Sequence, residues 1–173
     1  VKCLSIYLTS YINEEIERKA LTDSYEIVII GGGFGGVLAA SRLKEAGFSD
    51  FKIIEKGGNF GGTWYWNRYP GASCDIESYI YFPLLEETKF IPGKKYTNAP
   101  ETLEYFDVIS EKFGLNEHAI FQTEVDNVRW NDDERLWELN TNKGDKIKCN
   151  YVVHANGPLN RPKLPAINGI NDY

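Results

Sequence analysis

The sequence predicts an α/β fold of the Rossmann type, built around a parallel sheet. An apolar run, residues 25–30, has the composition of a strand that is buried on both faces. A glycine cluster, residues 31–36, follows this run directly and is itself followed by a helical pattern. A second short apolar run, residues 51–55, ends in a carboxylate about 20 residues beyond the glycines. This succession of strand, glycine turn, helix, strand and acid is typical of dinucleotide-binding domains.

The glycine cluster fits the pattern G-x-G-x-x-G, and each glycine has a different task. Gly31 permits the tight turn between strand and helix, Gly33 lets the backbone approach a pyrophosphate, and Gly36 lets the helix lie close to the strand. The pyrophosphate would bind to the free N–H groups at the start of the helix. The cofactor-binding candidates in the cluster are Gly31, Gly33, Phe34, Gly35 and Gly36.

The acid at the end of the second run is Glu55, which would accept hydrogen bonds from ribose hydroxyls. Its negative charge repels a 2′-phosphate, so the site suits FAD or NAD and not NADP. The spacing of the motif does not separate FAD from NAD. A glycine cluster alone is often a simple turn, but a strand, helix and acid in register favour a cofactor site.

The other elements are predicted from apolar periodicity and from turn residues. Residues 37–47 have apolar side chains at helical spacing and end in a glycine. Pro100 begins a second helix, which runs to about Phe113 and is ended by Gly114. The remaining predicted strands are residues 119–123, 125–131, 136–141, 146–149 and 151–154, the last of which rejoins the main sheet.

An unusual aromatic block occupies residues 61–78 and reads G-G-T-W-Y-W-N-R-Y-P-G-A-S-C-D-I-E-S. Ordinary surface loops favour small polar residues and do not place two tryptophans and two tyrosines so close together. The block is therefore expected to be buried, against a flat ring system. The alternative is that its aromatic side chains simply close a hydrophobic core.

From Gly31 to Gly71, and through the C-D-I-E-S that follows, the sequence resembles the N-terminal FAD-binding domain of class B Baeyer–Villiger monooxygenases. The aromatic block is close to diagnostic of that family. Related flavin-containing N- and S-oxygenases share the glycine motif but usually lack the aromatic run. The resemblance continues more weakly through Tyr81, the Val125 strand and residues 154–157. It implies a parallel sheet with an antiparallel meander inserted before its last strand, as in flavoproteins with two dinucleotide-binding domains.

The resemblance also implies that FAD is bound along its whole length. The glycine cluster would hold the pyrophosphate and Glu55 the ribose, while Val125 would offer backbone contacts to the adenine. The residues expected beside the flavin end are Gly62, Thr63, Trp64, Asp75, Ile76 and Tyr81.

Asp75 is the one catalytic candidate, because it resembles an aspartate that orients a catalytic arginine in the family. An aspartate paired with a cation stays ionised and fixes the position of its partner. The alternative is that Asp75 caps a helix that starts near Ile76.

Several features depart from the family pattern. Ser73 stands where the family commonly has arginine, and Asn156 where it often has threonine or serine. The second G-x-G-x-x-G motif and the fingerprint F-x-G-x-x-x-H-x-x-x-W are not found, and the catalytic arginine would lie beyond Tyr173. We therefore expect an FAD-binding portion that is incomplete at its C-terminus, with the second domain absent, and Val1 in place of a methionine suggests that the other end is incomplete too.

The implied function of the full-length protein is an FAD- and NADPH-dependent monooxygenase. It would use O₂ to convert a small-molecule ketone to an ester or lactone through a C4a-peroxyflavin. One alternative is a flavin-containing N- or S-monooxygenase, similar to N,N-dimethylaniline monooxygenase. Another is a non-catalytic FAD-binding remnant, and this is the outcome expected for the 173 residues alone.

Composition agrees with a globular cytoplasmic domain, since 42% of residues are hydrophobic and 25% are charged. A net charge of −6 argues against nucleic-acid or anionic-membrane partners. Three scattered cysteines without C-x-x-C disfavour a disulfide framework or a redox pair and suit the cytosol. The two histidines lack metal-ligand spacing. Nothing in the pattern predicts an oligomeric state.

The domain division predicted from the sequence is an N-terminal extension, residues 1–22, followed by the FAD-binding domain, residues 23–173. Residues 3–12 are too short and too often interrupted by hydroxyl groups to act as a membrane span or signal. Residues 13–21 have the charge pattern of a solvated helix, so the extension is expected to be partly helical.

Overall fold

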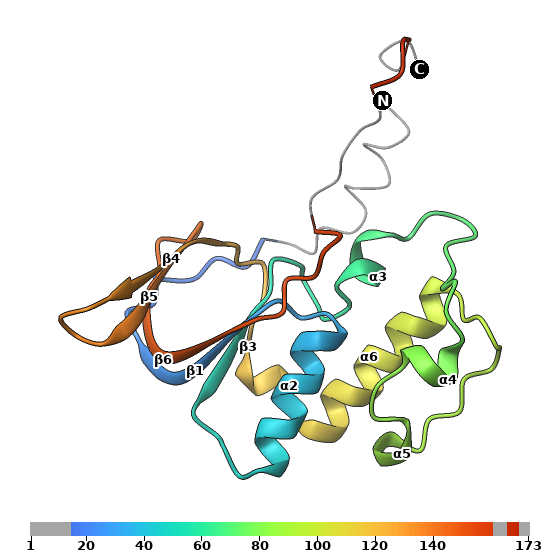
Figure 1. Cartoon of the computed structure of the whole chain (residues 1–173), viewed down its shortest axis with the longest axis horizontal. Coiled ribbons are helices and arrows are strands. Elements are labelled where there is room, and N and C mark those ends of the chain that lie inside the picture. The colour runs from blue at the N-terminus through green and yellow to red at the C-terminus, as the bar shows by residue number, and fades with distance from the viewer. Residues whose placement is uncertain (1–14, 161–165, 170–173) are drawn as a thin grey trace.

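The computed structural model describes residues 15–160 and 166–169 (Figure 1). A six-stranded mixed sheet, in the order β3-β2-β1-β6-β5-β4, forms the framework of the molecule. Its bounds are β1 Ser24–Ile30, β2 Phe51–Ile54, β3 Ala119–Ile120, β4 Val125–Asn131, β5 Leu136–Thr141 and β6 Lys146–His154. Strands β3, β2, β1 and β6 are parallel, whereas β6, β5 and β4 are antiparallel. The predicted α/β class, with a parallel sheet and an antiparallel meander, is therefore confirmed.

Strand β6 connects the two parts of the sheet and corrects the sequence-based expectation of two separate strands. Its first half pairs with β5, in the register Trp137↔Cys149, while Lys148 to His154 pair with β1. Asn150 does not end the strand, because the backbone on either side of it is held by a neighbouring strand.

Strand β3 is shorter than the predicted strand over residues 119–123. After Ile120 the chain turns at Gln122, whose φ is 51°. The backbone N–H of Gln122 donates to Gly57 O at 2.9 Å, and that of Thr123 donates to Glu55 O at 3.0 Å. This segment therefore lies against the loop that follows β2.

The helices cover the parallel part of the sheet, with α2 and α6 side by side (Figure 1). Helix α6, Ala99–Phe113, begins where Asn98 accepts a hydrogen bond from Glu101 N and ends at Gly114 in the left-handed conformation, as predicted. The other helices are α2 Phe34–Glu45, α3 Thr63–Trp66, α4 Ser78–Tyr81, α5 Leu85–Thr88 and the 3₁₀ turn η1 Asn116–His118.

Two hydrophobic clusters lie on opposite faces of the sheet, because neighbouring strand residues point to opposite sides. Ile27 and Ile29 pack with the helices, whereas Val28 packs with residues of the meander. Fully buried members of the helix-side cluster include Phe51, Phe60, Tyr105, Phe106 and Leu115. Fully buried members of the meander-side cluster include Ile54, Leu139, Ile147 and Cys149.

The segment before β1 is not helical, so the predicted helix over residues 13–21 is wrong for residues 15–21. Its backbone is bonded to other segments and not to itself. Ile16 N donates to the Gln122 side chain at 2.8 Å, and Lys146 N donates to Leu21 O at 2.9 Å. The remainder of the predicted extension lies outside the described residues. Among the residues that the structure describes, no helix is both long and apolar enough to cross a membrane.

Candidate dinucleotide-binding site

The turn from β1 into α2 requires glycine at two positions for the packing of the chain itself. Gly31 has a φ of +107°, and a Cβ there would lie 2.6 Å from Ala155 O. A Cβ on Gly36 would lie only 1.9 Å from Gly31 O, because α2 approaches the end of β1 so closely. These contacts agree with the tight turn and the close helix–strand packing predicted from the motif.

Gly33 is different, since neither its backbone conformation nor its neighbours require glycine. It precedes α2 with φ −79° and ψ −173°, which any residue adopts. A Cβ there would have only Gly62 Cα within 4 Å, at an ordinary 3.5 Å. A pyrophosphate lying against this backbone would explain the glycine, and no side chain caps the first turn of α2. Gly35, likewise, would place a Cβ only against Ala155 Cβ, at 3.7 Å.

Glu55 follows β2 and is buried, with 5% of its surface exposed. Its Oε2 atom accepts a hydrogen bond from Gly32 N at 2.5 Å, and its Oε1 atom accepts one from Gly57 N, also at 2.5 Å. Burial raises the pKa of Glu55, while the two backbone N–H groups act in the opposite direction. Each carboxylate oxygen can accept a second hydrogen bond, so ribose hydroxyls could still bind to it.

A second glycine loop packs against the first. Gly61 N donates to Gly32 O at 3.0 Å, which brings the loop after β2 to the start of α2. Gly62 has a φ of +51°, and a Cβ on it would lie 2.7 Å from Gly33 Cα. Because the two backbones meet here, Gly62 and the following Thr63 lie beside the glycine cluster, and their predicted place beside the flavin end stays a prediction.

Three of the predicted aromatic residues come together from separate segments of the chain. The Trp64 indole N–H donates to the Tyr81 hydroxyl at 3.0 Å. The ring of Tyr81 also meets Phe34 edge to face, with centroids 5.3 Å apart. Phe34 stacks in turn on Phe106 of α6, with centroids 4.2 Å apart. Burial raises the pKa of Tyr81.

The aromatic block is only half buried, which corrects the expectation that the whole block is covered. Trp64 and Tyr65 are 7% and 6% exposed, but Trp66 and Tyr69 are 50% and 62% exposed. Helix α3 is a single turn, so side chains that follow one another point in different directions and cannot all face the core. The buried pair agrees with the alternative that these rings close a core, and it leaves a role beside a ligand open.

Asp75 and Ile76 lie on an exposed segment between the buried Cys74 and α4. Asp75 does not cap this helix, because α4 begins at Ser78 and its N-cap residue is Glu77. That alternative role for Asp75 is therefore not found. Burial is the main cause of the raised pKa of Tyr81. Cys74 and the nearby charge of Asp75 raise this pKa further, by smaller amounts.

Val125 begins β4, is half buried, and follows closely in the chain on Gln122 and Thr123. The hydrogen bonds of Gln122 and Thr123 to that loop bring its segment beside Glu55. An ion pair between Lys56 and Glu124, at 2.9 Å, joins the same two segments on the surface. The predicted ribose and adenine contacts therefore come from adjacent segments.

Sequence reasoning missed the loop at residues 57–61 as part of the site. Gly57 supplies one of the two hydrogen bonds to Glu55, and Gly61 bonds to the glycine cluster. The signal was available, because four glycines occur between residues 57 and 62. Cys74 and Cys149 are both buried and unpaired with one another, and the described part of the chain has no group of residues suited to a metal ion.

A glycine turn at the carboxyl end of β1, a buried acid after β2 and a second glycine loop against the first define a dinucleotide-binding α/β protein. The chain belongs to the family described as pyridine nucleotide-disulphide oxidoreductase, whose model matches residues 28–173. Within the described residues no disulfide joins cysteines, and the sequence has no C-x-x-C pair.

The curated relatives include proteins named as Baeyer-Villiger monooxygenases and as FAD-binding monooxygenases. The chain is 47% identical, over 156 residues, to the Baeyer-Villiger monooxygenase ATR8 of Stachybotrys chlorohalonatus, which covers 90% of this chain and 25% of the relative. It is 42% identical, over 161 residues, to Baeyer-Villiger monooxygenase 4 of Dietzia sp., with 93% and 26% covered. The chain thus spans about a quarter of the length of these relatives.

Solved structures give the same result. The polycyclic ketone monooxygenase of Thermothelomyces thermophila superimposes with a TM-score of 0.79 at 40% identity, over 95% of this chain and 27% of that one. OTEMO, solved in complex with FAD and NADP, superimposes with a TM-score of 0.78 at 32% identity, over 86% and 29%. The resemblance to Baeyer–Villiger monooxygenases drawn from the sequence is confirmed.

Proposed function

We propose that this chain binds FAD and forms the FAD-binding part of an NADPH- and O₂-dependent monooxygenase that converts ketones to esters or lactones. The observation that supports FAD binding most directly is Gly33. Its backbone faces Gly62 beside the free end of α2, and nothing in the packing of the chain requires a glycine there. A dinucleotide pyrophosphate against this backbone accounts for it.

The residues present fit FAD from one end to the other. The first turn of α2 offers N–H groups and a positive dipole end to the pyrophosphate. Glu55 is fixed by Gly32 and Gly57 and accepts the ribose hydroxyls with its remaining lone pairs. The segment that leads to Val125 lies beside Glu55 and takes the adenine.

At the other end, Gly62, Thr63 and Trp64 lie beside the flavin ring, with Tyr81 held by the Trp64 indole. When bound, FAD provides the group that accepts hydride from NADPH and that activates O₂. The chain positions the flavin and excludes water from it. Asp75 lies exposed near this end and orients a cationic side chain that approaches it.

Ketone oxidation is preferred over nitrogen or sulfur oxidation because two relatives, at 47% and 42% identity, are named as Baeyer-Villiger monooxygenases. The two reactions are separated by product analysis with a cyclic ketone and a sulfide. This assay would use a protein in which the present chain is joined to an NADPH-binding domain. We expect the cyclic ketone to be converted to a lactone while NADPH and O₂ are consumed. Sulfoxide as the main product would favour the N- or S-oxygenase alternative.

FAD binding is tested on the 173-residue chain itself. The chain is incubated with FAD and freed of excess ligand, and the flavin released on denaturation is quantified and separated from FMN. Gly33→Ala should keep the fold, measured by circular dichroism, but bind FAD at least about tenfold more weakly, since its methyl group enters the pyrophosphate position. Gly93→Ala is the matched control and should bind normally, because it lies outside the proposed site and its methyl group would meet only the flexible end of the Glu101 side chain.

A folded wild-type chain that takes up no FAD would contradict the proposal. Equal FAD affinity in Gly33→Ala and wild type would show that the pyrophosphate does not lie against this backbone.

A further inference from the structure

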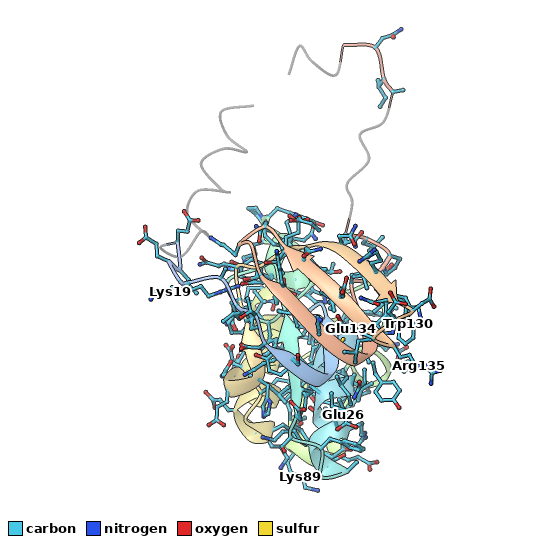
Figure 2. All side chains as sticks on the ribbon, turned by 90° about the vertical axis from the view of Figure 1, so that its left-hand side faces the viewer. Lys19, Glu26, Lys89, Trp130, Glu134 and Arg135 are labelled. Carbon is cyan, nitrogen blue, oxygen red and sulfur yellow. The ribbon has the colours of Figure 1, made fainter. Side chains whose placement is uncertain are left out.

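The segment before β1, residues 15–23, crosses the turn between β5 and β6, and we call it the N-terminal strap. Figure 2 shows the strap at the side of the sheet, with Lys19 pointing to solvent. Leu21 N donates to Asp145 Oδ1 at 2.8 Å, and Lys148 N donates to Asp23 O at 3.1 Å. The Lys143 ammonium group pairs with Glu15 at 2.6 Å. The strap is thus fixed to the turn by main-chain and side-chain contacts.

The centre of this contact is an ion pair between Arg18 and Asp145. The guanidinium binds both carboxylate oxygens, each at 2.6 Å, and Thr141 Oγ1 donates to the same carboxylate at 2.6 Å. The Asp145 side chain is fully buried, whereas a fifth of the Arg18 side chain is exposed. The Arg18 guanidinium holds the pKa of Asp145 at about 2.

Arg18 also reaches beyond the turn. Its second terminal nitrogen donates to Thr123 Oγ1 at 3.1 Å, and Thr123 is 1% exposed. Thr123 N donates in turn to Glu55 O at 3.0 Å. Two hydrogen bonds therefore connect the guanidinium to the backbone of the residue that binds ribose in the proposed function.

A buried ion pair adds little net stability, because the free energy lost by removing both charges from water is about as large as that gained from their attraction. Its planar fork geometry does, however, fix the relative position of the groups that it joins. Here those groups are the strap, the turn after β5 and the segment that leads to Val125. The segment that leads to Val125 lies at the adenosine end of the proposed site.

We propose that Arg18 is a positioning residue for the adenosine half of FAD. Paired with Asp145, it holds Thr123 and so fixes the Glu55 backbone and the segment leading to Val125. The inference depends on the proposed FAD binding. It predicts that ligands containing adenosine depend on Arg18, whereas a ligand that carries only the flavin half does not.

The test is a binding titration of the 173-residue chain with FAD, ADP and FMN. In Arg18→Met, FAD and ADP should both bind about tenfold more weakly, while the affinity for FMN stays unchanged. Arg129→Met is the matched control, because Arg129 also pairs with a carboxylate, Glu138, at 2.8 Å on the exposed part of the meander. Figure 2 places the neighbouring Trp130 across the sheet from Lys19. The control should bind all three ligands as wild type does.

A second variant separates positioning from a loss of stability. Thr123→Val removes the hydroxyl that Arg18 binds, together with its local hydrogen bond to Phe121 O at 3.0 Å, and leaves the Arg18–Asp145 pair intact, so it remains informative if Arg18→Met does not fold. We expect about threefold weaker FAD and ADP binding and unchanged FMN binding.

Unchanged ADP and FAD affinity in a folded Arg18→Met or Thr123→Val chain would overturn the inference. An equal loss for FMN and ADP would do the same, since it would show a general structural role. Wild-type chain that binds no FAD would instead contradict the proposed function.

Discussion

The adenosine end of the proposed site is built from backbone atoms, whereas the flavin end is built from side chains. At the adenosine end, the glycine cluster and Glu55 are held by main-chain N–H groups and by close approaches between backbones. At the flavin end, Trp64 and Tyr81 lie on helices of four residues each and are held by one side-chain hydrogen bond and by ring contacts.

The difference shows what each end requires. Contacts between backbones leave almost no freedom in residue type, so a single added methyl group is expected to disturb the adenosine end. Aromatic contacts tolerate similar rings, and the segment from Trp66 to Ile80 also leaves several large side chains exposed. The flavin end should therefore tolerate substitution better than the adenosine end.

The largest effect is expected for Gly36→Ala. The new methyl group would meet Gly31 O, so α2 would have to move away from β1, and we expect a loss of about 3 kcal/mol in the free energy of unfolding. Urea denaturation measures it. Gly35→Ala, one position earlier in the same helix, should not be destabilised. Equal stability of the two variants would show that backbone contact does not limit the adenosine end.

Glu55→Ala should come next. It leaves the N–H groups of Gly32 and Gly57 without their acceptor, at a cost of about 2 kcal/mol, and it also removes the proposed ribose contact. Denaturation and FAD titration measure the two effects separately. Lys56→Ala is the control, because the Lys56–Glu124 pair is exposed and its loss should change stability by less than about 0.5 kcal/mol.

Low pH should destabilise the fold at the adenosine side, because it protonates Asp145. The pKa of this carboxyl is lowered from 3.8 to about 2 by Arg18, so its stabilising contribution is complete above pH 3.8 and is lost as the pH falls through about 2. Thermal unfolding across this range should show a steeper decline for wild type than for Asp145→Asn. Parallel curves would mean that the ion pair does not contribute in this way.

The smallest effects are expected at the flavin end. Trp64→Phe removes the hydrogen bond to Tyr81 but keeps a ring, and should cost about 1 kcal/mol. A double-mutant cycle with Tyr81→Phe would isolate the pair. Asp75→Asn, at an exposed position, should change stability by less than about 0.5 kcal/mol. If Trp64→Phe lowered the free energy of unfolding as much as Gly36→Ala does, the contrast between the two ends would be contradicted.

Much of this contrast could be read from the sequence, because the adenosine end depends on local signals. The glycine motif, the strand before it and Glu55 are close together in the chain, and the structure brings Glu55 and Gly32 into contact. Strands β4 and β5 have the predicted bounds, since turn residues limit them on both sides. The helix that ends at Gly114 was predicted for the same reason.

The errors occurred where distant segments decide the outcome. Residues 15–21 have the charge pattern of a helix, but Asp145 and Gln122 offer their backbone other hydrogen-bond partners. Asn150 is typical of a turn, but β1 and β5 hold the strand on either side of it. Trp66 is exposed because successive side chains of α3 point in different directions, and Tyr69 lies beyond the end of that helix, where it is also exposed.

The sequence by itself determined the α/β class, the glycine turn, the acid that follows it and the family, because these depend on residue types at fixed local spacing. Only the tertiary structure decided that Gly33 has no packing reason to be glycine, that Gly57 and Gly32 share one carboxylate, and that Arg18 reaches Thr123, whose backbone bonds to Glu55. Apart from the local Gly57–Glu55 hydrogen bond, these contacts join residues of separate segments, and they form only when the sheet brings those segments together.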